Sequence, residues 1–103
     1  HTMATLGDKI VLFGGEQDAN HILADTWEYD GASWTQKTVP GPGKRYHHGM
    51  TTLGSKLVLF GGDPGAGTST PFLADTWEWD GATWTPLNVK GPSGRYAYTM
   101  ATR

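Results

Sequence analysis

Two stretches of the chain share one pattern of apolar and polar positions. Each contains a continuous apolar run, Ile10 to Phe13 in the first stretch and Leu57 to Phe60 in the second, and a glycine pair closes each run. A short uninterrupted apolar run is typical of a strand that is buried on both faces. We therefore expect buried strands over residues 9–13 and 56–61.

Alternating segments follow the apolar runs, over residues 24–30 and 74–80. In the second segment Trp77 and Trp79 fall on one face of a strand, and Glu78 falls on the other. Each segment ends in Asp-Gly, which is a strong hairpin signal because glycine adopts the positive φ that such turns need.

Two further strands complete the second unit. Residues 46–53 precede the buried run, and residues 84–88 follow the hairpin; Pro86 in the latter suits the edge of a sheet, because proline cannot donate to a ladder. Neither capping signals nor a helical period occur. The pattern predicts an all-β chain built from four-stranded units.

The two units are an internal repeat. Residues 1–15 match residues 48–62 at 11 of 15 positions, and Leu-Ala-Asp-Thr-Trp-Glu recurs at 23–28 and 73–78. Gly-Pro and Arg-Tyr at 41–46 return at 91–96. A spacing of this size indicates stacked supersecondary units, each of which needs neighbours to cover its apolar faces.

These motifs resemble the kelch repeat of bacterial and galactose-oxidase-type propellers. The resemblance covers nearly the whole chain and implies a β-propeller with two four-stranded antiparallel blades per chain. It implies that each glycine pair lets a third-strand aromatic and a fourth-strand tryptophan pack over the sheet. The residues that carry this structural motif are Gly14, Gly15, Gly61, Gly62, Tyr29, Trp34, Trp79 and Trp84.

We expect blade 1 at residues 1–44, blade 2 at 45–94, and an extra first-strand segment at 95–103 that could swap into a neighbouring chain. Propellers close with about four to eight blades. The expected ring is therefore a homo-oligomer, six blades as a trimer or eight as a tetramer, and we favour the trimer. The near-identity of the repeats and the abrupt start at His1 favour an engineered or excised piece.

Composition narrows the range of partners. The net charge of −2 argues against nucleic acid and anionic membrane partners, and no apolar stretch approaches the roughly 20 residues of a membrane span. The chain lacks cysteine, which excludes disulfides and thiolate metal sites. We expect no cofactor.

Histidines and carboxylates offer little catalytic chemistry. We expect His47 and His48 to be adjacent on a strand and to point to opposite faces, so that they cannot chelate one metal ion together. They are candidates for a channel or ligand face, although symmetry copies of one histidine could also converge on a ring axis. The aspartates at 25, 30, 75 and 80 recur in step, which favours turn and cap roles over catalysis.

Arginine recurs at the start of the first strand, as Arg45 and Arg95. These residues could grip an anionic ligand at a channel mouth. We favour inter-blade ion pairs with Glu28 and Glu78, because a mostly covered carboxylate needs a charge partner.

Longer connections, at 16–22, 38–44, 63–72 and 88–94, should emerge at one end of the blades. Loops on a rigid scaffold often carry recognition, so a protein or carbohydrate ligand could bind there. The sequence favours a non-enzymatic, self-assembling propeller used as a scaffold or interaction platform. A ligand-binding part of a larger propeller is the alternative, and part of a galactose-oxidase-like enzyme is less favoured because no matching ligand set occurs.

Overall fold

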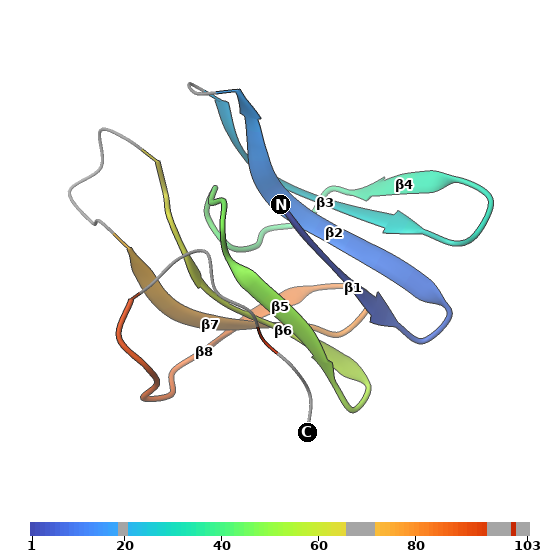
Figure 1. Cartoon of the computed structure of the whole chain (residues 1–103). Helices are drawn as coiled ribbons and strands as arrows, with labels where there is room; N and C mark the ends of the chain where they lie inside the picture. The colour runs from blue at the N-terminus through green and yellow to red at the C-terminus, as the bar shows by residue number, and fades with distance from the viewer. Residues whose placement is uncertain (19–20, 66–71, 95–99, 101–103) are drawn as a thin grey trace.

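The computed structural model describes residues 1–18, 21–65, 72–94 and 100 (Figure 1). This part of the chain forms two four-stranded antiparallel sheets and no helix. The first sheet, blade 1, has the order β1-β2-β3-β4, and the second, blade 2, has the order β5-β6-β7-β8. The strands are β1 (Thr2–Leu6), β2 (Lys9–Asp18), β3 (His21–Tyr29), β4 (Trp34–Lys37), β5 (Gly49–Leu53), β6 (Lys56–Gly62), β7 (Leu73–Trp79) and β8 (Trp84–Leu87).

The predicted all-β architecture is confirmed, and the differences at strand ends are small except at two places. The predicted strand at 46–53 begins only at Gly49, because His47 adopts a φ of 56° and interrupts the extended backbone. The predicted loop at 16–22 is shorter, since β2 continues to Asp18 and β3 begins at His21. Alternation could not reveal the extension of β2, because Glu16, Gln17 and Asp18 are all polar.

The register of the strands divides each blade into two faces. One face carries the tryptophans, and we call it the tryptophan face: Met3, Ile10, Leu12, Trp27, Tyr29 and Trp34 in blade 1, and Met50, Leu57, Leu59, Trp77, Trp79 and Trp84 in blade 2. The opposite face, the phenylalanine face, holds Val11, Phe13, Thr26 and Glu28 in blade 1, and Val58, Phe60, Thr76 and Glu78 in blade 2.

The two blades stack with the tryptophan face of blade 2 on the phenylalanine face of blade 1. Leu57, Leu59 and Trp79 from blade 2 are fully buried in this contact, as are Val11 and Phe13 from blade 1. The blades lie side by side, with the inner strands β1 and β5 adjacent (Figure 1). Burial of apolar area between the sheets supplies most of the stabilisation of the pair.

Trp84 is the central side chain of this contact. Its ring meets Phe13 edge-on with centroids 5.4 Å apart, and its Nε1 donates a buried 3.0 Å hydrogen bond to Thr26 Oγ1. The ring also lies against Gly41, where an added Cβ would come within 2.6 Å of it. A tryptophan from the fourth strand of one blade thus joins that blade to the third strand of the preceding one.

The glycine pairs mark a bulge between β2 and β3 and another between β6 and β7. Gly15 and Gly62 both have a φ of 108°, a region that side chains with a Cβ disfavour. Added Cβ atoms would lie 2.6 Å from the Cβ of His1 and 2.8 Å from the Cβ of His48, respectively. The second glycine of each pair therefore makes room for the residue that leads into the inner strand.

Trp34 is the residue of blade 1 that corresponds to Trp84, but it is 45% exposed, whereas Trp84 is 6% exposed. Comparing the two residues tests how much the stacking of the blades contributes to the free energy of unfolding. Replacing Trp84 with alanine should cost about 3–5 kcal/mol, the usual range for a buried aromatic. Replacing Trp34 should cost clearly less in dilute protein. Urea unfolding of both variants measures the difference, and equal losses would show that the blades do not stack as described.

Candidate functional site

Arg45 connects the two blades through its backbone and its side chain. Its N–H donates to the carbonyl of Leu23 at 3.2 Å, and its carbonyl accepts from Gly15 N–H at 2.9 Å, so its backbone extends the bonding of blade 1. Its side chain turns the other way, into blade 2, and the residue as a whole is only 2% exposed. The residue therefore belongs to both blades.

The guanidinium of Arg45 binds Asp75 on β7 through two bonds, Nη1 to Oδ1 at 2.7 Å and Nη2 to Oδ2 at 2.9 Å. Nη1 also donates to the carbonyl of Gly61 at 3.0 Å, and Nε donates to the carbonyl of Gly43 at 3.0 Å. A bidentate arginine–carboxylate pair is among the stronger polar contacts in proteins. Partial burial opposes ionisation of Asp75, but the hydrogen bonds from Arg45 and Trp77 hold its pKa below the usual value.

The predicted pairs of Glu28 and Glu78 with Arg45 are wrong within the described residues. Glu28 lies 3.3 Å from Lys37 and 3.7 Å from Lys9, and Glu78 lies 3.4 Å from Lys56. The strand alternation explains the difference, because Arg45 approaches the tryptophan face of blade 2, whereas Glu78 lies on the phenylalanine face. Arg95 lies outside the described residues.

The recurring aspartates have two different roles. The turn role is confirmed for Asp30 and Asp80, whose Oδ1 atoms accept backbone N–H bonds at 2.8–3.0 Å from the two residues that follow each Asp-Gly pair. These bonds lower the pKa of both carboxyls. The turn role is wrong for Asp25 and Asp75, which instead accept the indole N–H of the tryptophan two residues on, at 2.7 and 2.8 Å.

His48 is buried where the inner strands meet the blade interface. It is 3% exposed, its ring lies edge-on to Phe13 with centroids 5.7 Å apart, and neither ring nitrogen has a hydrogen-bond partner in the part of the chain that is described. Burial, with the positive charges of the amino terminus and Arg45, lowers the pKa of His48 to about 3. The imidazole is therefore neutral and packs between the blades.

A polar pocket of about 290 Å³ lies at the end of the inner strands, lined by His1, Glu16, Tyr46 and His47. The rings of Tyr46 and His47 lie 4.6 Å apart within it. The sequence had pointed to His47, His48, Arg45 and Arg95 as a channel or ligand face. Of the three that the structure describes, His47 lines the pocket, whereas His48 and Arg45 are buried in the inter-blade contact.

The paired aromatics of the repeat motif lie close together in both blades. Tyr29 and Trp34 have ring centroids 5.1 Å apart, and Trp79 and Trp84 have centroids 5.3 Å apart. Sequence reasoning missed Asp75 and Thr26 as partners across the sheets and blades. A usable signal existed for Asp75, because an aspartate recurs in each repeat in step with the arginine.

The model of the KLHDC2/KLHL20/DRC7 Kelch-repeats domain matches the chain over residues 1–103. A search of curated proteins found no match. No group of three or more histidine, cysteine or acidic side chains is arranged to hold a metal ion in the regions that the structure describes. Those regions also hold no helix long and apolar enough to cross a bilayer.

Removing the arginine that joins the blades should lower the free energy of unfolding. Replacing Arg45 with alanine removes the donor of the Gly61 carbonyl and the charge partner of Asp75, whose side chain is 40% exposed, so the loss should be about 1–3 kcal/mol. The matched control is Lys56→Ala, which removes the exposed partner of Glu78 and should change the unfolding free energy by only about 0.2–1 kcal/mol. Denaturant unfolding checks both values, and a small effect at Arg45 would contradict its inter-blade role.

Stability should depend on pH through His48. Its pKa falls from 6.5 to about 3 on folding, so between these values the unfolded chain binds more protons than the folded one. The contribution of the neutral His48 imidazole to the free energy of unfolding should therefore be fully present above about pH 6.5. It should decline as the pH falls toward 3, by at most about 1.4 kcal/mol per pH unit. Unfolding curves from pH 7 to pH 4 measure the slope, which should be shallower in His48→Phe; an unchanged slope would contradict the burial of a titrating imidazole.

Proposed function

Because the chain belongs to the kelch-repeat family, we propose that it supplies two adjacent blades of a closed propeller that serves as a protein-interaction platform. Kelch repeats generally mediate protein binding and are generally non-enzymatic. Two blades are fewer than the about four to eight that close a ring. The proposed role is accordingly that of a scaffold, completed by further blades of the same kind.

The observation that carries this proposal is the unequal burial of one face in two nearly identical blades. The tryptophan face of blade 2 is covered by blade 1, so Trp84 is 6% exposed and Met50 is 6% exposed. The same face of blade 1 has no cover within the described residues, and its Trp34 and Met3 are each 45% exposed. The chain thus presents the surface that its own second blade buries.

The phenylalanine face of blade 2 is the complementary surface. Glu28 and Thr26 on blade 1 are 6% and 3% exposed beneath the second blade, whereas Glu78 and Thr76 on blade 2 are only partly buried. Phe60 on the same face of blade 2 is already 7% exposed, so this face is open only in part. The exposed parts of the two outer faces are of the two types that already meet inside the chain. Such a head-to-tail contact between copies forms a closed ring or an open filament.

We infer that copies of this chain close into a ring, most favourably three chains with six blades. A tetramer with eight blades satisfies the same contacts, whereas equal two-blade chains cannot make a seven-blade ring. Blade faces that remain open in a monomer would form a larger apolar patch than soluble monomers usually show. Closure covers both faces without a new kind of contact.

A second candidate role, binding of a carbohydrate or peptide ligand, is supported by the pocket at the end of the inner strands. Its lining combines aromatic, imidazole and carboxylate groups from Tyr46, His47 and Glu16. Concave sites of this mixed polarity suit small polar ligands. The ends of β2 and β6 that lead toward β3 and β7 lie at this end of the blades, opposite the tight β1–β2 and β5–β6 turns (Figure 1).

Solution mass tests the ring. Multi-angle light scattering should give about three times the 11.1 kDa chain mass, and the melting temperature should rise with protein concentration because folding and association are linked. Trp34→Glu should shift the protein to monomer. The control is Val89→Glu, at a residue that is 59% exposed beyond β8, and it should leave the mass unchanged. An 11.1 kDa species with a concentration-independent melt would refute self-assembly.

A further inference from the structure

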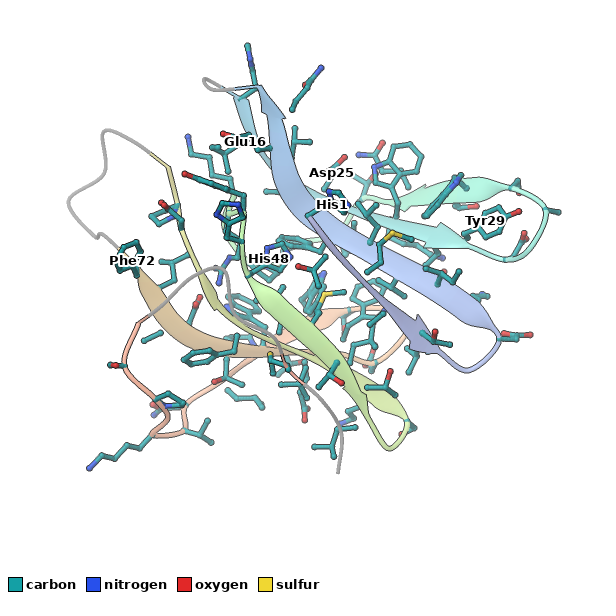
Figure 2. The ribbon with its side chains drawn as sticks, in the orientation of Figure 1. His1, Glu16, Asp25, Tyr29, His48 and Phe72 are labelled. Carbon is teal, nitrogen blue, oxygen red and sulfur yellow. The ribbon has the colours of Figure 1, made fainter. Side chains whose placement is uncertain are left out.

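We propose that the tryptophan face of blade 1 carries a binding site for an arginine side chain, centred on Asp25, and that Arg95 of a second copy fills it. This inference rests on the proposed assembly of copies into a ring. It adds a specific polar contact to the apolar stacking of the faces. The site itself lies in the described part of blade 1, on β3 (Figure 2).

Blade 2 shows what such a site looks like when it is filled. Asp75 receives Arg45 through two bonds of 2.7 and 2.9 Å, while its Oδ2 also accepts the Trp77 indole N–H at 2.8 Å. The arginine comes from a segment whose backbone is bonded to the preceding blade. The pair therefore lies across a blade-to-blade contact and forms only where two blades meet.

Blade 1 holds the same arrangement without the arginine. Asp25 occupies the same repeat position as Asp75, and its Oδ2 accepts the Trp27 indole N–H at 2.7 Å. Its Oδ1 is shielded from solvent and has no hydrogen-bond partner among the described residues. A carboxylate oxygen that is desolvated and unpaired is costly, and a guanidinium is the donor that would satisfy it, because its two parallel N–H groups match the carboxylate.

The repeat identifies the arginine. Arg-Tyr occurs at 45–46 and again at 95–96, and the aspartate of the motif occurs at 25 and 75. Arg45 and Asp75 already pair with each other, which leaves Asp25 and Arg95 as the remaining acid and base of the motif. Asp25 lies on blade 1, and Arg95 follows blade 2 in the sequence. A head-to-tail neighbour, whose second blade would precede this first blade, is therefore the source that we assign.

The route of the chain before Arg95 supports this assignment. The N–H of Arg45 reaches blade 1 at the carbonyl of Leu23, near the start of β3. Gly94 lies at the equivalent place on blade 2, where an added Cβ would be 2.6 Å from the carbonyl oxygen of Phe72 and 3.2 Å from that of Leu73. The backbone that leads to Arg95 thus meets the second blade as the backbone that leads to Arg45 meets the first.

The experiment measures association by analytical ultracentrifugation for the wild type, Asp25→Asn, Arg95→Gln and the double variant. The Asp25→Asn change keeps an acceptor for the Trp27 indole but removes the charge. Each single variant should raise the dissociation constant by at least about tenfold, and the double variant should be no weaker than the weaker single one. The matched control is Asp75→Asn, which should lower the stability of the single chain, whereas Asp25→Asn should leave it unchanged or raise it.

The outcomes separate this inference from the proposal on which it rests. A wild type that remains monomeric would refute the ring and, with it, the second copy as the source of the arginine. A wild type that assembles while both variants assemble equally well would leave the ring and overturn the Asp25 site. An effect of Asp25→Asn without one of Arg95→Gln would also overturn the assignment, because the arginine would then come from elsewhere.

Discussion

The arrangement of the two blades depends on Arg45. Its backbone is bonded to Leu23 and Gly15 of blade 1, and its buried guanidinium is held by Asp75 and the carbonyl of Gly61 in blade 2. Apolar burial alone would permit two twisted sheets to slide or rotate, because it has no direction. The bidentate ion pair has a direction, so it fixes one relative position in which Trp84 reaches Thr26 and Phe13.

Strand alternation gives each blade two unlike faces, and the relative position of the blades determines which face meets which. The phenylalanine face of one blade receives the tryptophan face of the next, and the contact cannot be satisfied by two copies of the same face. Because each contact joins two unlike faces, successive blades add head to tail in one direction, which is how a propeller ring is built. Trp34, 45% exposed, and Asp25, with its unpaired oxygen, both belong to the face of blade 1 that no other blade covers among the described residues.

The polar groups that recur in each repeat therefore serve the blade contact more than they serve chemistry. His48 is neutral and packed against Phe13, and the glutamates lie beside lysines of their own blade. The pocket that Tyr46 and His47 line lies outside the blade contact, at the end opposite the tight β1–β2 and β5–β6 turns. In the proposed propeller, the side chains between the blades are buried by stacking. Binding would therefore use side chains at the rim, as is usual for rigid repeat architectures.

The sequence by itself determined the repeat and most of the strands, because these follow from local alternation, apolar runs and Asp-Gly turns. The aromatic pairs were implied by the resemblance to the kelch repeat. It also showed that acids and bases recur in step. It could not decide that Arg45 pairs with Asp75 rather than Glu78, since both acids have the same spacing and only the face that meets the preceding blade separates them. His47 likewise has no local signal for its φ of 56°, which comes from the path between two blades. Which side chains meet between two sheets depends on how the sheets stack, and that arrangement is set only in the tertiary structure.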